Sequence, residues 1–154
     1  MKLIQVAHAM TKHDGASKFV LEMDKIFKQL GYESEIYAHK IDTRIEYPIK
    51  PMSSFDGGPE DILIYQMTTG TSFNKWVYNY PYKIVLYYHN ITPAKYFLGN
   101  AWGSFFQCLA GRRHLKKIVK NTFFGWGASE YSCNELRELG LQHTRPLAAI
   151  VEPE

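Results

Sequence analysis

Short apolar runs alternate with amphipathic segments along the chain. The first run, residues 3–9, is followed by a turn and then by apolar residues at helical spacing, which predict a helix that stops at Gly31. The next apolar run, residues 32–38, completes a strand, helix, strand unit of ordinary length. Such a unit joins parallel strands by a right-handed crossover.

The same alternation continues in the second half of the chain. Further strands are predicted at 61–67, 83–88, 122–126 and 147–151, and further helices at 71–79 and 129–139. Residues 96–119 predict two helical pieces, because Gly99, Gly103 and Gly111 interrupt the pattern. The connection 39–60 is rich in proline and glycine, and its pattern fits a functional loop as well as a mobile one.

Strands that alternate with helices six times predict an α/β fold. We expect a Rossmann-like, doubly wound parallel sheet of about six strands with helices on both faces, in a single domain over residues 1–154. Loops that follow parallel strands open on one edge of the sheet, so loops 8–15, 68–71, 89–93 and 127–129 should converge. The candidate site residues on these loops are Asp14, Gly15, Ala16, Thr68, His89, Asn90 and Ser129.

Motifs and composition narrow the class of protein. The chain has two cysteines without metal-type spacing, which indicates free, buried thiols of a reducing compartment. Its start runs directly into a strand, and no apolar run is long enough to span a bilayer, so we expect a cytoplasmic protein. No dinucleotide fingerprint, P-loop, zinc motif or nucleophile elbow occurs, so no cofactor and no metal are expected.

A polar pair follows one of the apolar strands, in the segment Tyr-Tyr-His-Asn-Ile-Thr-Pro that ends at Pro93. His89 titrates near neutrality and can donate or accept a hydrogen bond to a ligand, although a loop histidine bonded to backbone fits equally well. Asn90 fits turn chemistry as well as binding. The turn at Asp14 and Gly15 offers backbone N–H groups at the positive end of a helix, and a simple tight turn is the alternative.

Basic residues are concentrated in one place although the formal net charge is only +3. The cluster consists of Arg112, Arg113, Lys116, Lys117 and Lys120, with no acidic residue among them. Aromatic residues at 96–106 precede it, a composition that suits a helix on an anionic membrane surface. Core aromatics beside a solvated basic face remain the alternative. Nucleic acid is not expected as a partner, because no reading motif accompanies the charges.

Three segments together resemble the N-terminal domain of retaining, GT-B-fold glycosyltransferases of the family 4 type. They are the strand and loop 83–93, the turn Asp14-Gly15-Ala16-Ser17, and the run from Ala128 to Tyr131. The resemblance covers nearly the whole chain. It implies that His89, in the catalytic role, contacts the donor sugar in the cleft of the complete enzyme. Family members usually have a glycine-rich loop where this chain keeps only Gly15.

The resemblance also implies a division of labour. The N-terminal domain supplies most of the acceptor site, and a second domain, expected to be absent here, binds the nucleotide sugar. We therefore expect the acceptor-binding half of a glycosyltransferase that moves a glycosyl group to a glycan or lipid-linked acceptor, as in polysaccharide biosynthesis, and that is inactive alone. Its expected partners are a donor-domain protein or a second copy, and the inner face of a membrane. The alternative is a non-catalytic α/β binding or regulatory module.

Overall fold

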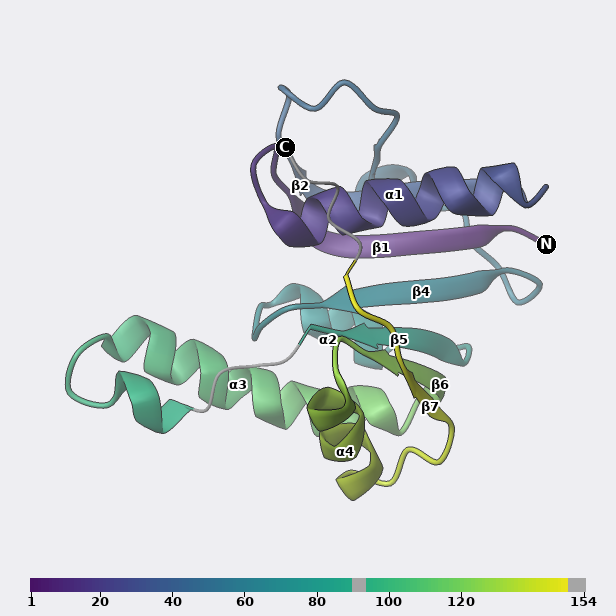
Figure 1. The fold of residues 1–154 in the computed structure, drawn as a ribbon. Coiled ribbons are helices and arrows are strands. Elements are labelled where there is room, and N and C mark those ends of the chain that lie inside the picture. Colours follow the sequence, from purple (N-terminus) through teal and green to yellow (C-terminus); the bar gives the residue numbers. More distant parts are fainter. Residues whose placement is uncertain (90–93, 150–154) are drawn as a thin grey trace. The chain divides into compact units, whose positions relative to one another are not determined.

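The computed structural model describes residues 1–89 and 94–149 (Figure 1). In chain order its elements are β1 (Leu3–Met10), α1 (Gly15–Gln29), β2 (Ser34–Ile41), β3 (Lys50–Pro51), the 3-10 helix η1 (Met52–Ser54), β4 (Ile62–Met67), α2 (Phe73–Tyr78), β5 (Ile84–Tyr88), the 3-10 helix η2 (Ala94–Phe97), α3 (Trp102–Val119), β6 (Thr122–Gly127), α4 (Glu130–Glu138) and β7 (Thr144–Pro146). The strands form a seven-stranded sheet in the order β3-β2-β1-β4-β5-β6-β7.

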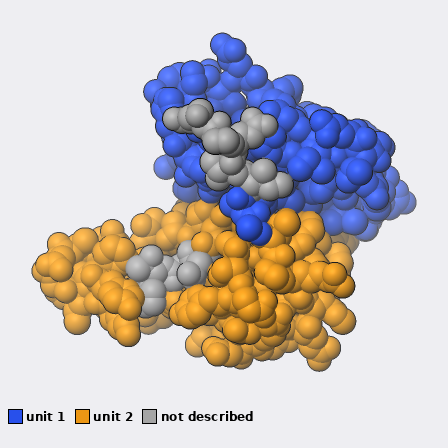
Figure 2. All heavy atoms as spheres, in the orientation of Figure 1, with its two compact units in different colours: residues 1–66, 148–154 blue, residues 67–147 orange. Residues whose placement is uncertain are grey.

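The predicted fold class is confirmed. The pairings of β1 with β2 and β4, of β2 with β3, and of β6 with β5 and β7 are all parallel. α-Helices stand between β1 and β2, between β4 and β5, between β5 and β6, and between β6 and β7. The structure has one strand more than the six predicted. This additional strand, β3, has two residues and lies within the connection 39–60, where the sequence shows no strand pattern. Contacts divide the chain into two compact units, Met1–Gln66 with Ala148–Glu154 and Met67–Leu147 (Figure 2).

In the first unit, α1 packs on the strands through one apolar face. Phe19, Val20 and Met23 are buried on it, and Asp14 caps its start. Gly31, with φ of 92°, follows the helix as the predicted left-handed stop. Val20 belongs to a core cluster with residues of β1 and β2, and its carbonyl accepts a hydrogen bond from the buried Gln5 Nε2 (3.0 Å). Burial of the apolar side chains of this cluster stabilises the unit.

The connection between β2 and β3 is ordered by packing and hydrogen bonds. Ile45, Tyr47 and Ile49 pack against the core cluster of the first unit. The Asp42 N–H donates to the Met10 carbonyl (2.9 Å), and the Tyr47 hydroxyl donates to the Asp24 carboxylate of α1. These contacts order residues 42–49, which argues against the mobile alternative for that part of the connection, and the functional alternative stays a prediction.

In the second unit, the long region 96–119 forms two helical pieces, η2 and α3, as predicted, but only one of the three glycines separates them. Gly99, with φ of 83°, separates η2 from α3, but Gly103 and Gly111 lie inside one continuous helix. A glycine inside a helix costs about 1 kcal/mol relative to alanine and does not by itself end the helix. Both cysteines are free and buried, as predicted.

The last predicted strand is also misplaced. β7 spans Thr144–Pro146, and Leu147 and the two alanines after it are not in a strand; positions 150 and 151 lie outside the described residues. β7 pairs with β6 through backbone groups at the sheet edge, with Arg145 and Pro146 exposed. An edge strand of this kind does not need an apolar run. The apolar residues after β7 therefore led to a strand being predicted too far along the chain.

Within residues 1–89 and 94–149, no helix has the length and apolar character that crossing a membrane requires. In the same part of the chain, no group of three or more His, Cys, Asp and Glu residues is arranged to hold a metal ion.

Candidate functional site

Three of the predicted loops meet in the second unit, at the carboxyl ends of neighbouring strands. The His89 N–H donates to the Met67 carbonyl (3.0 Å), and the Ala128 N–H donates to the Tyr88 carbonyl (3.1 Å). Thr68, His89 and Ser129 therefore follow strands that are joined edge to edge. Thr68 and Ser129 are exposed and His89 is half-buried. Loop 8–15 belongs to the first unit and is described with it; Asn90 and the rest of loop 89–93 lie outside the described residues.

The Tyr87 ring contacts the His89 ring. The two residues are two positions apart along the chain, and their ring centroids lie 4.4 Å apart. The Tyr87 hydroxyl donates to the Leu147 carbonyl. Burial raises the pKa of Tyr87 to about 12, so the phenol keeps its proton at neutral pH and remains a donor. The sequence gives no signal for Tyr87 as a supporting residue, because an aromatic side chain in an apolar strand predicts only core packing.

Ser129 has a structural task at the start of α4. Its Oγ accepts a hydrogen bond from the Ser132 N–H (3.3 Å), which satisfies one of the free N–H groups of the first turn. A Cβ at Gly127 would lie 2.7 Å from the Cys133 nitrogen, so glycine lets α4 begin close against β6. The Ser129 hydroxyl can still donate its proton to a ligand above the strand ends.

Loop 68–71 is fixed against the helices of the second unit. The buried Asn74 donates from Nδ2 to the Thr69 carbonyl (3.0 Å). A Cβ on Gly70 would lie 2.3 Å from the Gln107 carbonyl oxygen and 2.4 Å from the Gly111 nitrogen, so this loop meets the backbone of α3 directly. In the sequence, a glycine after a predicted strand is the only signal for Gly70, and Asn74 has none.

In the first unit, the turn before α1 is explained by capping. The Asp14 carboxylate accepts from the Ser17 N–H (3.2 Å) and from the Ser17 hydroxyl (3.0 Å). Gly15 is the first residue of the helix, and a Cβ added to it would meet nothing within 4 Å. The exposed Asp14 carboxylate therefore occupies the helix end that an anion would otherwise approach. Ala16 is half-buried beside it.

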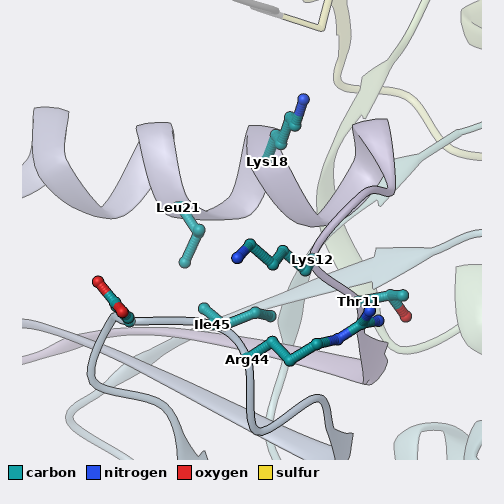
Figure 3. Close-up of a pocket in the computed structure, with 7 residues that line it drawn as sticks. Thr11, Lys12, Lys18, Leu21, Arg44 and Ile45 are labelled. Atoms are coloured by element: carbon teal, nitrogen blue, oxygen red, sulfur yellow. The ribbon is translucent and has the colours of Figure 1, made fainter.

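A hollow of about 330 Å³ lies next to this turn (Figure 3). It is lined by Thr11, Lys12, Lys18, Leu21, Arg44, Ile45 and Glu46. Arg44 donates from Nε and Nη2 to the two carboxylate oxygens of Asp42 (3.0 and 2.8 Å). These hydrogen bonds hold the pKa of Asp42 well below its usual range. No sequence pattern predicts this hollow, because it forms from segments about 30 residues apart.

The basic cluster of α3 is not one uniform face. Arg112 pairs with Glu135 of α4 (3.3 Å), and Glu135 also accepts from the Tyr88 hydroxyl (2.6 Å). The Lys117 ammonium lies 4.8 Å from the centre of the Tyr78 ring. The remaining members, Arg113, Lys116 and Lys120, are exposed.

Four large apolar side chains near η2 and the start of α3 are more than half exposed. They are Tyr96 (66 %), Leu98 (58 %), Trp102 (53 %) and Phe106 (61 %). We call them the exposed apolar set. Trp102 and Phe106 are in ring contact, with centroids 6.3 Å apart. The alternative that these aromatic residues are core does not hold for the members of this set.

No protein-family model and no curated protein matches the sequence. Ten chains of solved structures match the fold, and two of them are described as an alpha-glucosyltransferase. One, in complex with UDP and a 13-mer DNA containing a HMU base, aligns over 97% of this chain and 42% of its own with 16% identity and a TM-score of 0.63. The other, in complex with UDP and a 13-mer DNA containing a central A:G mismatch, aligns over 86% of this chain and 38% of its own with 17% identity and a TM-score of 0.58.

These likenesses show a glycosyltransferase-like fold. The chain spans less than half the length of either neighbour. Both neighbours were solved with DNA, so the expectation that nucleic acid plays no part gains no support from them.

Proposed function

We propose that this chain is the acceptor-binding half of a retaining GT-B glycosyltransferase of the family 4 type. The observation that carries the proposal is the fold match, which covers 97% of this chain but only 42% of an alpha-glucosyltransferase solved with UDP. A UDP complex points to a nucleotide sugar as the donor. The glycosyl group would pass from it to a glycan or lipid-linked acceptor, as in polysaccharide biosynthesis.

In this proposal the strand ends of the second unit contact the sugars. The His89 imidazole donates a hydrogen bond to the donor sugar, and Tyr87 keeps its ring in place. Thr68 and Ser129 offer hydroxyl groups on the neighbouring loops. Asp14, Gly15 and Ala16 of the first unit would contact the acceptor through their backbone, and Asn90, the residue expected to shape the loop after His89, lies outside the described residues.

Transfer also needs groups that stabilise the leaving diphosphate, and in GT-B enzymes of this type a second domain supplies them. The 154 residues alone should bind sugars without transferring them. We expect the chain to associate with a donor-domain protein. The alternative partner is a second copy of the chain. The competing proposal is a non-catalytic binding or regulatory module with the same half-domain fold.

An NMR titration tests the proposal on the chain as it is. Addition of UDP-glucose and of candidate glycans should shift backbone resonances of Thr68, His89 and Ser129 more than those elsewhere in the second unit. His89→Ala should weaken the response, whereas His143→Ala, at an exposed histidine after α4, should not. No shift at these three residues with any nucleotide sugar or glycan would contradict the proposal. Robust transfer by the pure chain would contradict the division into halves.

The charge distribution bears on where the acceptor is met. Residues 62–129 contain no Asp or Glu but eight Lys and Arg residues, and the exposed apolar set lies within this stretch. We propose that the exposed apolar set and the basic cluster contact an anionic membrane that carries lipid-linked acceptors. The basic cluster consists of Arg112, Arg113, Lys116, Lys117 and Lys120. DNA, with which both neighbours were solved in complex, is the second candidate for the acceptor, and the same basic stretch favours it.

A further inference from the structure

The hollow beside α1 in the first unit combines basic groups with an apolar wall (Figure 3). We propose that it binds an anionic sugar, one that bears a phosphate, sulfate or carboxylate group. That this sugar is part of the acceptor rests on the proposed function. The binding site itself rests on the residues that line the hollow.

The walls of the hollow are held in position before any ligand arrives. The Asp42 carboxylate accepts from the Arg44 guanidinium and from the Lys12 N–H (3.2 Å). Since the Asp42 N–H is itself bonded to the Met10 carbonyl, the loop after β2 and the turn after β1 are tied together. Preorganised walls reduce the conformational entropy that the site itself loses when a ligand binds.

Lys12 supplies the charge that is available to a ligand. Arg44 is neutralised by Asp42, with its guanidinium engaged at both carboxylate oxygens. The Lys12 side chain instead runs between α1 and the loop that carries Ile45, toward Leu21, while Lys18 points away from it at the rim (Figure 3). Among the residues that the structure describes, none forms a hydrogen bond or ion pair with the Lys12 ammonium.

The apolar wall and the size of the hollow favour a sugar ring over a bare ion. Leu21 and Ile45 are half-buried and pack against the core cluster, so they form a fixed surface for the C–H face of a ring. A volume of about 330 Å³ lies at the lower end of the range for small-molecule sites, which suits one or two sugar rings. Glu46 is the one acidic residue in the lining, and it would disfavour a ligand with several charges.

Binding to the purified chain tests this inference. Glucose 6-phosphate, glucuronate, glucose and inorganic phosphate are titrated separately, with NMR shifts of Lys12, Leu21 and Ile45 as the readout. We expect the two charged sugars to bind at the hollow and to bind more tightly than glucose or inorganic phosphate. Lys12→Gln should weaken their binding about five- to tenfold, the loss of one charge-assisted hydrogen bond.

Two further variants make the test specific. Lys25→Gln changes an exposed lysine of the same helix that pairs with Glu22 outside the hollow, and it should leave binding unchanged. Glu46→Gln removes the repulsive charge and should tighten binding about twofold, the usual scale of an exposed charge interaction. Binding that is insensitive to Lys12→Gln would overturn the inference. So would equal affinity for glucose and glucose 6-phosphate, or equal affinity for inorganic phosphate and glucose 6-phosphate.

Failure here can be distinguished from failure of the proposed function. If UDP-glucose shifts Thr68, His89 and Ser129 while charged sugars leave the hollow unchanged, only this inference is wrong. If charged sugars bind at Lys12 while no nucleotide sugar or glycan shifts those three residues, the hollow stands and the proposed function is wrong.

Discussion

Asn74 Nδ2 lies 3.1 Å from His114 Nδ1 and thereby joins α2 to α3. The same amide donates to the Thr69 carbonyl, so one buried side chain connects a candidate-site loop with the helix that carries the basic cluster. If Nδ2 donates to His114 as well, Nδ1 is the acceptor and the ring proton resides on Nε2. Burial and the nearby Lys117 charge lower the pKa of His114, which agrees with a neutral ring.

Stability should therefore decrease in mildly acidic solution. Below pH 6.5 the unfolded chain binds a proton at His114 that the folded chain resists. Unfolding thus takes up protons, and the free energy of unfolding falls as the pH is lowered from 6.5 through the folded pKa. His8, whose pKa is lowered by burial and by Lys40, acts in the same direction. Urea unfolding at pH 5.5 and 7.5 measures the effect.

His114→Gln should reduce this pH dependence, because one of the two resisting histidines is removed. His143→Gln, at an exposed histidine, should leave it unchanged. An identical change in unfolding free energy between the two pH values for wild type and His114→Gln would show that the Asn74 and His114 pair does not resist protonation.

Gly70→Ala should destabilise the second unit. The new methyl group would lie 2.3 to 2.9 Å from backbone atoms of Gln107 and Gly111, and backbone cannot move aside as a flexible side chain can. Overpacking of this kind costs about 1–3 kcal/mol. Gly103→Ala in α3 is the matched control, because its methyl group meets nothing within 4 Å and alanine favours helix by about 0.5–1 kcal/mol. Thermal unfolding measures both variants. An equal decrease in the unfolding midpoint of the two would contradict the close approach of Gly70 to the backbone of α3.

His89→Ala should slow glycosyl transfer in an enzyme completed by a donor domain. The expected loss is that of one preorganised hydrogen bond, no more than about 3 kcal/mol of barrier, with kcat reduced more than KM is changed. Tyr87→Phe retains the ring that contacts His89 and removes only the bond to Leu147, so it should have a much smaller effect on kcat. Steady-state kinetics of the wild type, His89→Ala and Tyr87→Phe measures both effects. An unchanged kcat for His89→Ala would show that His89 is a structural loop residue.

The sequence predicted those features that depend on local conformation or on general rules of parallel sheets. Gly31 was identified as a helix stop because a left-handed residue is needed there, and its φ of 92° agrees. The adjacency of Thr68, His89 and Ser129 followed from the rule that parallel strands end on one edge. Gly111 looks the same as Gly31 in the sequence, yet it lies inside a helix. Its role is contact with Gly70, which no local pattern records.

The features that the sequence could not predict depend on contacts between distant segments. The hollow at Lys12 exists because Asp42, 30 residues later, bonds back to the turn after β1. β7 was misplaced because backbone pairing with β6, not side-chain burial, selects Thr144–Pro146. Tyr87 reads as a core residue in any strand, and only its contact with His89 gives it a place in the candidate site.

The last prediction concerns the exposed apolar set and the basic residues that follow it. Anionic vesicles should bind the chain, because each basic residue near the surface contributes about 1 kcal/mol and Trp102 and Phe106 can bury apolar area at the headgroup boundary. Binding should weaken with added salt. Trp102→Ala with Phe106→Ala, and separately Arg113→Gln with Lys116→Gln, should each reduce the fraction that co-sediments.

Arg113 and Lys116 are chosen because Arg112 is engaged by Glu135, so that changing it would also unpair a half-buried carboxylate. Tyr131→Ala removes an equally exposed aromatic side chain from α4 and should not affect vesicle binding. A duplex oligonucleotide is titrated in parallel, because the basic stretch alone also attracts DNA. DNA binding should depend on Arg113 and Lys116 but not on Trp102 and Phe106, since the duplex offers no apolar phase to receive them. Equal recovery on neutral and anionic vesicles, together with DNA binding, would contradict the membrane proposal. It would favour nucleic acid as the partner of this surface.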